Sequence, residues 1–346
     1  MEGLFQVRVI DWYTKDEKGT FGKDEELARF LYMPKGSINF DLNRSHPEDR
    51  WKEADHYTRE QNLDTLLEWI VKNCNDARGR PKRLEAEFAS FRGMLRKIMC
   101  AQYEKNRSES LKICAIKAKG TIYLCRFYTA ENEQNCTQQN EDHDQVRFTK
   151  YGRVFEHYMV SNRPGVKPDV RQPLSEFQEF CCVYKSRFGV NSMIYCAEVN
   201  GLGKEEDLKQ IDRASLYELK TCKEKPNPYS LARYKKITWW AQSVLAKIDS
   251  VVVGYRNDSG FVREVEVLPV HDIPRQAKGW DANSCMLFLQ DFLRQVKDEM
   301  MNARKEEVFE FTWYPGQTHF SARKLPRNND CYFIPEWYLQ WLKNMP

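Results

Sequence analysis

The stretch YCAEVNGLG, at residues 195–203, is an apolar run that ends in two polar side chains, Glu198 and Asn200. Side chains alternate between the two faces of a β-strand, so residues two apart point the same way. The stretch SLYELKTC, at residues 215–222, repeats this arrangement after a charged loop. We therefore predict two strands whose ends each present a polar pair on one face.

The polar pair of the second stretch is Glu218 and Lys220. If the two strands are neighbours in a sheet, two carboxylates, one amide and one ammonium group converge. Mg²⁺ and Mn²⁺ prefer oxygen ligands, and a nearby lysine can orient a water molecule or stabilise charge that develops on phosphorus. The pattern favours a metal-dependent hydrolytic centre of the Glu-x-Lys nuclease type. The alternative is a set of surface ion pairs on exposed strand faces.

A third carboxylate, Glu156, closes the segment YGRVFE, in which Gly152 permits close approach of the backbone. Residues 153–160 are short and apolar, which predicts a strand. One hypothesis places Glu156 in the same carboxylate cluster. The alternative is a surface glutamate at the end of that strand.

Residues 228–248, PYSLARYKKITWWAQSVLAKI, predict a helix. Lys235, Trp239 and Gln242 are spaced i, i+4 and i+7, so they share one helical face. Trp240 then points elsewhere, into the core. The shared face is a candidate contact for a nucleic-acid backbone or base, and the alternative is a half-buried tryptophan with solvated neighbours.

Residues 83–104 predict another helix, which breaks down near its end. Within it, Arg92 directly precedes Gly93, where a phosphate could approach the backbone. Arg92 is therefore a candidate phosphate ligand. A solvated basic helix face is the alternative.

The remaining patterns mix helices and strands without the regular βαβα order of a Rossmann fold, which favours an α+β fold. Residues 129–144 are polar and predict a surface loop. The chain contains no P-loop, no G-x-S-x-G elbow and no H-E-x-x-H motif, which disfavours those chemistries. The other predicted elements are helices at 62–73 and 281–303, the second with N-cap candidates at its start. Strand pairs are predicted at 111–128, joined at Lys119 and Gly120, and at 250–270, with a late strand at 308–315.

The composition is that of a mildly basic, reduced protein of 346 residues with a formal net charge of +4. The N-terminus meets charged residues too early for a signal peptide, and no apolar run approaches the roughly 20 residues that span a bilayer. The eleven cysteines show no C-x-x-C spacing, so buried thiols are expected rather than zinc ligands. We expect a nuclear or cytoplasmic location. RGRPKR at 78–83 is a candidate targeting segment, with a solvated loop as its alternative.

The segments SFRGMLRKIM, YGRVFEHYM, YCAEVNG, LYELKT and RYKKITWWAQSVL follow one another in this order, before VVVGYRNDSG, GWDANSCMLFLQDFL and FTWYPG. Together they resemble the DXO/Rai family of eukaryotic RNA decapping nucleases over about residues 25–340. The resemblance implies a single α+β domain over residues 1–346, with two mixed or antiparallel sheets packed among helices and an active-site pocket between them. It also implies hydrolysis of RNA 5′ ends: incomplete, non-canonical or NAD caps, pyrophosphate from triphosphate ends, and 5′–3′ degradation.

The same resemblance implies a role for each matching residue. A Mg²⁺ or Mn²⁺ cofactor would be held by Glu156, Glu198, Glu218 and the backbone carbonyl of Leu219, with Glu198 binding directly or through water. Lys220 would position the attacking water or the scissile phosphate. The residues that contact RNA would be Arg92, Gln242 and Lys235.

Asn200 departs from the resemblance, because the family pattern is Glu-x-Asp and its aspartate is a metal ligand. An amide oxygen can still coordinate a cation, but one negative charge is lost, which weakens cation binding and the polarisation of bound water. The alternative function is therefore a catalytically impaired family member that binds RNA 5′ ends or scaffolds a partner 5′–3′ exoribonuclease. Neither a membrane nor DNA is expected as a partner.

Overall fold

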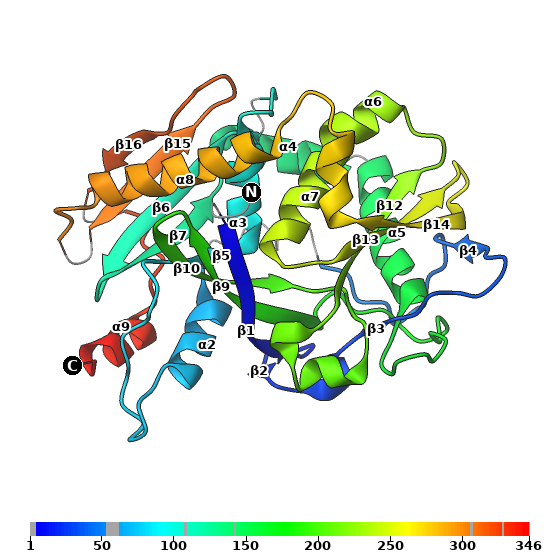
Figure 1. Ribbon diagram of the computed structural model, residues 1–346, viewed down its shortest axis with the longest axis horizontal. Helices are drawn as coiled ribbons and strands as arrows, with labels where there is room; N and C mark the ends of the chain where they lie inside the picture. The colour runs from blue at the N-terminus through cyan, green and yellow to red at the C-terminus, as the bar shows by residue number, and fades with distance from the viewer. Residues whose placement is uncertain are drawn as a thin grey trace.

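The computed structural model describes residues 5–52, 62–106, 109–141, 143–304, 307–326 and 329–345. Within these residues the strands form two sheets, which Figure 1 shows at left and right. The first, nine-stranded sheet has the order β16 (Ser321–Lys324), β15 (Val308–Trp313), β6 (Leu111–Ala118), β7 (Thr121–Phe127), β5 (Phe88–Phe91), β10 (Asn191–Glu198), β9 (Glu179–Phe188), β1 (Phe5–Lys15) and β2 (Phe21–Gly22). The second, seven-stranded sheet has the order β4 (Phe40–Asp41), β14 (Phe261–Pro269), β13 (Ser250–Arg256), β12 (Leu216–Lys223), β11 (Gly201–Leu202), β3 (Phe30–Leu31) and β8 (Val160–Ser161).

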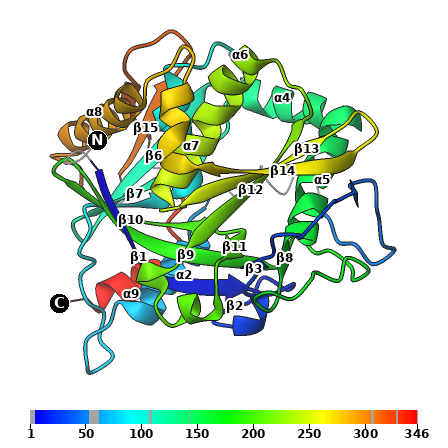
Figure 2. The ribbon, with the colours of Figure 1, turned by 45° about the vertical axis from the view of Figure 1, so that its right-hand side comes forward.

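The segment after β10 connects the two sheets (Figure 2). β10 belongs to the first sheet, whereas β11, which begins after two intervening residues, pairs antiparallel with β12 of the second sheet through Gly201 and Tyr217. The two strands predicted from the polar pairs are therefore confirmed. They are not direct neighbours, because they belong to different sheets and the short β11 pairs with β12.

Helices cover both sheets. Their bounds are α2 (Asp64–Asn73), α3 (Arg92–Ala101), α4 (Ala130–Glu141), α5 (His143–Met159), α6 (Pro228–Ser230), α7 (Lys236–Leu245), α8 (Ala282–Glu299) and α9 (Glu336–Lys343). A π-helical segment, Leu231–Lys235, joins α6 to α7 and completes the helix predicted at 228–248. Among the described residues, no helix has both the length and the apolar character needed to cross a membrane.

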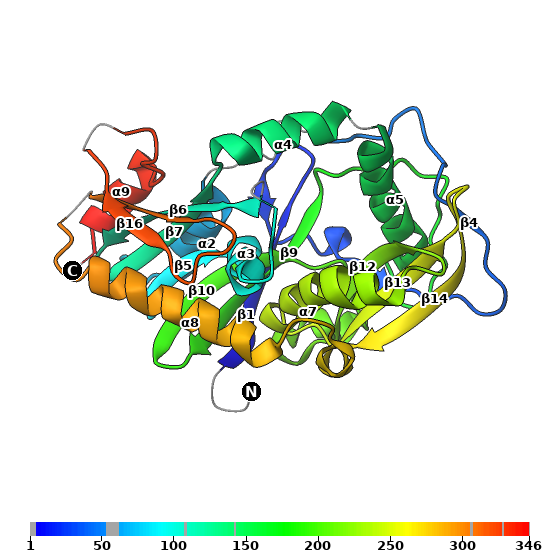
Figure 3. The ribbon, with the colours of Figure 1, turned by 90° about the horizontal axis from the view of Figure 1, so that it is seen from above.

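The middle strands of the second sheet, β12 and β13, are covered by α5 and α7, which lie on opposite sides of the sheet (Figure 3). Alternate residues of β13 face the two helices: Val252 packs in the cluster that contains α5 side chains, and Val251 and Val253 pack in the cluster that contains α7 side chains. This continuous apolar run is the pattern of a strand covered on both faces. The arrangement places α5 and α7 on either side of β12, which carries Glu218 and Lys220.

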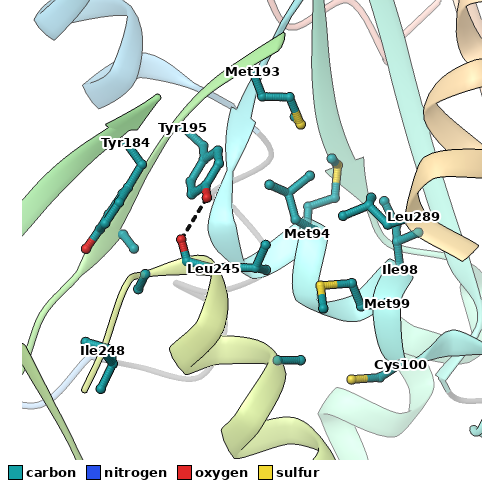
Figure 4. Close-up of a cluster of buried hydrophobic side chains, with 14 of the residues drawn as sticks. Met94, Ile98, Met99, Cys100, Tyr184, Met193, Tyr195, Leu245, Ile248 and Leu289 are labelled. Carbon is teal, nitrogen blue, oxygen red and sulfur yellow. Dashed lines mark hydrogen bonds between the residues drawn. The ribbon is translucent and has the colours of Figure 1, made fainter. Parts of the chain in front are cut away.

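A large apolar core holds α3 and α7 against the first sheet (Figure 4). Met94 and Ile98 of α3 belong to the same buried cluster as Tyr195 of β10. The Tyr195 hydroxyl donates a hydrogen bond of 2.7 Å to the backbone carbonyl of Leu245, at the end of α7. The end of α7 is thereby tied to β10 three residues before Glu198.

Three predicted elements were wrong. Residues 153–160 belong to helix α5 rather than to a strand, because Tyr151, Val154, Phe155 and Met159 form one buried face at helical spacing. Within 83–104, Phe88–Phe91 form strand β5, which pairs with β7 and β10, before α3 begins.

The predicted loop at 129–144 contains helix α4. The Thr129 hydroxyl accepts from the Asn132 backbone N–H at 3.2 Å, and the Asn132 side-chain oxygen accepts from the Thr129 backbone N–H at 3.1 Å. This reciprocal cap stabilises the start of the helix. The sequence offered no apolar periodicity here, so composition alone was misleading.

The predicted fold class is confirmed: helices and strands are mixed, the two sheets are packed among helices, and a cavity lies at their junction. The strand pair at 111–128 turns at Lys119 and Gly120, both with positive φ, as predicted. α8 begins at the predicted N-cap position, where Asp281 accepts from the Ser284 N–H. The cysteines that the structure describes are free thiols, and all but Cys74 are buried.

Candidate active site

The candidate site lies where β5 and β10 end. These two strands run parallel, so their carboxyl ends lie at the same edge of the first sheet. β10 ends at Glu198, and β5 ends directly before Arg92, the first residue of α3. Two cavities, of about 390 and 460 Å³, meet this edge, and Glu198 lines both.

Glu218, on β12, is a buried carboxylate held by two cations. Its Oε1 lies 2.5 Å from the Lys220 Nζ, and its Oε2 lies 3.8 Å from the Arg92 Nη1. The Arg92 guanidinium also donates to the backbone carbonyl of Gln242, at 3.3 Å. A charge this deeply buried is stable only when it is paired, because desolvation alone costs several kcal/mol. The four residues thus link β12, α3 and α7.

Asn200 connects the sheet junction to β12. Its side-chain oxygen accepts a hydrogen bond of 3.0 Å from the backbone N–H of Leu219. Of the next two acids along the chain whose side chains the structure describes, Glu205 is exposed and Asp207 accepts from the N–H groups of Gly203 and Lys204. Neither of them lines a cavity at the site. Asp207 therefore does not replace the carboxylate that Asn200 lacks.

Arg153, on α5, joins three carboxylates from three parts of the chain. Its Nη1 lies 3.0 Å from Glu156 and 3.0 Å from Glu198, and its Nε lies 3.3 Å from Glu176. Neither Arg153 nor Glu176 was predicted as a site residue. Had α5 been recognised as a helix, the i, i+3 spacing of Arg153 and Glu156 would have placed them on one face.

Glu156 and Glu198, two of the predicted metal ligands, have pKa values shifted in opposite directions. Burial raises the pKa of Glu156 above its ordinary value. Burial also acts to raise the pKa of Glu198, but the charge and hydrogen bond of Arg153, with smaller contributions from Lys52 and Arg92, outweigh it and leave that pKa lowered. The charges of Glu198 and Glu156 in turn hold the pKa of Arg153 well above its usual range.

The donor chemistry of the site fits a hard divalent cation. The predicted ligands supply carboxylate oxygens from Glu156, Glu198 and Glu218, the amide oxygen of Asn200 and the backbone carbonyl oxygen of Leu219. However, the described residues contain no group of three acidic, histidine or cysteine side chains already arranged to hold a metal. The carboxylates are instead held by the protein's own cations, Arg153, Lys220 and Arg92.

The structure places Lys235 away from the other predicted site residues. It is exposed, belongs to the π-helical segment and lines neither cavity, whereas Gln242 lines the larger one beside Arg92. Trp239 is buried with Trp240, so the predicted Lys–Trp–Gln face is not a continuous surface. The roles of the residues that do meet remain predictions.

Comparison with known proteins identifies the family. Residues 6–339 match the model of the RAI1-like PD-(D/E)XK nucleases. The chain belongs to this family. The resemblance to the DXO/Rai family is thereby confirmed, and with it the prediction that the chain is a member of a family of hydrolytic nucleases.

Relatives of the RAI1-like chain agree with this assignment. The decapping and exoribonuclease protein of Bos taurus is 32% identical over 342 residues, covering 95% of this chain and 83% of the relative. The protein of the same name from Homo sapiens is 30% identical over 339 residues, with the same coverage of 95% and 83%.

Solved structures share the fold of the RAI1-like chain. Scheffersomyces stipitis Rai1 superposes with a TM-score of 0.84 at 19% identity, covering 98% of this chain and 97% of that one. Candida albicans Rai1, solved in complex with pU5-Mn²⁺, gives a TM-score of 0.80 at 15% identity, covering 98% and 96%. At these identities the match establishes the common architecture.

Proposed function

We propose that this nuclease is a divalent-metal-dependent hydrolase of RNA 5′ ends. Its substrates are incompletely or non-canonically capped RNA, including NAD-capped RNA, and 5′-triphosphate RNA, which it then degrades 5′–3′ in the nucleus or cytoplasm. The observation that carries the proposal is the position of Arg92. It lies 3.8 Å from Glu218 of the second sheet, which pairs with Lys220, and it lines the larger cavity together with Glu198 of the first sheet. The names of the curated relatives, decapping and exoribonuclease proteins, support the reaction class.

The cofactor in this proposal is Mg²⁺ or Mn²⁺. Glu156, Glu198, Glu218 and the Leu219 carbonyl would hold it, with Asn200 contributing its amide oxygen if that group turns from the Leu219 N–H. When bound, the cation supplies a more acidic water molecule and neutralises charge on the phosphate.

The protein's own cations act on the phosphate. The Lys220 ammonium group is oriented by Glu218 at 2.5 Å, where it can hold the attacking water or the scissile phosphate. The Arg92 guanidinium lines the larger cavity and is fixed by the carbonyl of Gln242, so it can bind a phosphate oxygen with little loss of conformational freedom.

The two cavities provide room on both sides of Glu198. The larger is lined by Arg92, Arg96 and the Gln242 side chain, which suits an RNA backbone. The smaller is lined by Arg29 and Lys167 and can receive the group beyond the scissile phosphate. Cleavage beside Glu198 would then separate the 5′ group from the chain.

The proposal is tested with 5′-labelled triphosphate, unmethylated-cap and NAD-capped RNAs. Purified protein is incubated with each RNA in Mn²⁺ and then in EDTA, and the Glu218→Ala variant is assayed in parallel. Turnover that both EDTA and Glu218→Ala abolish is the expected result. Turnover that persists in EDTA would contradict the metal requirement.

A second candidate function follows from Asn200 and Arg153. The first removes a carboxylate from the family pattern, and the second holds two of the remaining carboxylates. A protein with such a site could bind RNA 5′ ends or scaffold a partner 5′–3′ exoribonuclease without cutting. RNA binding with no turnover in any assay would favour this candidate over the hydrolase.

A further inference from the structure

The Arg153 guanidinium occupies the centre of an acidic cluster. One cation faces Glu156, Glu198 and Glu176, each with an oxygen within 3.3 Å. Three carboxylates so close together repel one another unless a cation neutralises them. In the described structure, the arginine side chain fulfils that requirement.

Glu176 anchors the Arg153 guanidinium through its Nε atom. Glu176 is buried, and its second carboxylate oxygen accepts a hydrogen bond of 2.8 Å from the backbone N–H of Lys52. Its first oxygen faces the Arg153 Nε at 3.3 Å. The anchor directs Nη1 of Arg153 toward both Glu156 and Glu198, at 3.0 Å from each.

Glu156 and Glu198 are also two of the ligands in the proposed function. An arginine is charged at every accessible pH, so the guanidinium does not leave by losing its proton. A divalent cation held by the same two carboxylates would lie close to the positive charge of Arg153, whose Nη1 is 3.0 Å from each of them. Like-charge repulsion therefore opposes cation binding unless the guanidinium moves away.

We propose that Arg153 is a built-in competitor of the divalent cation, which holds Glu156 and Glu198 in the metal-free state and weakens metal binding. The inference rests on the proposed function for the existence of the metal site. Glu176 does not belong to the ligand set, so it can keep the displaced guanidinium beside the cavity that Arg153 lines. The competition stabilises the metal-free protein at the expense of metal affinity.

A purely structural role predicts different behaviour. If Arg153 only ties α5 to β10, its removal loosens both ligands and leaves metal affinity unchanged or lower. If Arg153 competes, its removal leaves repelling carboxylates that bind a cation more tightly. The sign of the change in affinity therefore separates the two roles.

The experiment measures metal binding without RNA. Wild type, Arg153→Met and Arg147→Met are titrated with Ca²⁺ and with Mn²⁺ by calorimetry, and the melting temperature of each is recorded with EDTA and with saturating metal. Arg147 is the matched control, because it lies on the same helix, is exposed and pairs with the exposed Asp144 at 2.8 Å.

We expect Arg153→Met to bind both ions about 10- to 100-fold more tightly than wild type, the range typical of groups that tune metal ligands. Its melting temperature should fall below that of wild type in EDTA, and the difference should shrink in saturating metal. Arg147→Met should match wild type in both respects. If Arg153→Met does not fold without metal, Arg153→Lys keeps the charge but loses the two-sided contact and should show a smaller gain in affinity.

Two outcomes would overturn the inference, and they differ in what they say of the proposed function. Equal or weaker binding by folded Arg153→Met or Arg153→Lys would overturn the competition alone. Absence of metal binding by wild type and every variant would overturn both the competition and the metal requirement.

Discussion

The backbone of Gly254, on β13, lies directly against the ring of Phe155, on α5. A methyl group at position 254 would come within 2.4 Å of that ring, well inside van der Waals contact. Phe155 is fully buried, and its helix carries Arg153 and Glu156. The absence of a side chain at Gly254 therefore sets how closely the helix with a predicted metal ligand approaches the second sheet.

Gly254→Ala should destabilise the protein by about 1–3 kcal/mol, because the overpacked ring cannot move without shifting α5. The same shift should weaken metal binding through Glu156. Denaturant unfolding and calorimetric titration with Mn²⁺ measure the two effects. Gly152→Ala is the control: it lies on α5, has no atom within 4 Å of the added methyl group, and should be neutral or stabilising by up to about 1 kcal/mol.

A compensating substitution tests the cause. In Gly254→Ala/Phe155→Leu, the smaller side chain makes room for the new methyl group, so the double variant should be more stable than the sum of the two single effects allows. Strictly additive effects would show that the two positions do not compete for space.

The parts of this structure that the sequence predicted depend on short-range patterns. The turn at Lys119 and Gly120 and the N-cap at Asp281 are each decided within a few residues. That Glu218 and Lys220 share one face of β12 followed from the period of two along a strand. Patterns of this kind can be recognised from a few neighbouring residues alone.

The parts that were missed depend on contacts far along the chain. Phe88–Phe91 form a strand because β7 and β10 flank them, and their own sequence resembles the helix that follows. That β10 and β12 lie in different sheets depends on the two residues of β11. Arg153 could not be placed in the site while its segment was read as a strand, since its three partners meet only in the folded chain.

Lys220→Met should lower the rate of RNA cleavage about 100- to 1000-fold, the range for loss of one group that stabilises developing charge. RNA binding should change little, because Arg92 remains. Lys223→Met is the matched control, since Lys223 ends the same strand and, within the part of the chain that the structure describes, forms an ion pair only with the exposed Asp258, at 2.7 Å. Single-turnover rates and RNA affinities for both variants provide the measurement, and a Lys220→Met rate within a few-fold of wild type would remove Lys220 from the reaction.

The buried thiols should make the protein sensitive to alkali. Burial raises the pKa of Cys182 and of Cys196 to about 12. Between about pH 8.5, where an unfolded thiol ionises, and about pH 12, the unfolded state has lost protons that the folded state keeps. The free energy of unfolding should therefore fall as pH rises through this window, by at most about 1.4 kcal/mol per pH unit for each thiol.

Urea unfolding at pH 8 and pH 10 measures this loss. Cys182→Ala removes one contributing thiol and should reduce the difference in stability between the two pH values. A variant with the same difference as wild type would assign the alkaline sensitivity to other groups, such as the buried tyrosines.

Asn200→Asp should restore a carboxylate to the site without disturbing the fold. In the wild type the Asn200 side-chain oxygen accepts from the Leu219 N–H at 3.0 Å. An aspartate keeps an oxygen at this position, so the hydrogen bond to β12 is retained. The added negative charge should lower the melting temperature in EDTA and raise the affinity for Mn²⁺ about 10- to 100-fold, with a faster rate of cleavage. Asn200→Ala is the comparison, because it removes the acceptor and should cost about 1–3 kcal/mol of stability. Unchanged metal affinity and rate in Asn200→Asp would show that the amide oxygen already serves the site as well as a carboxylate does.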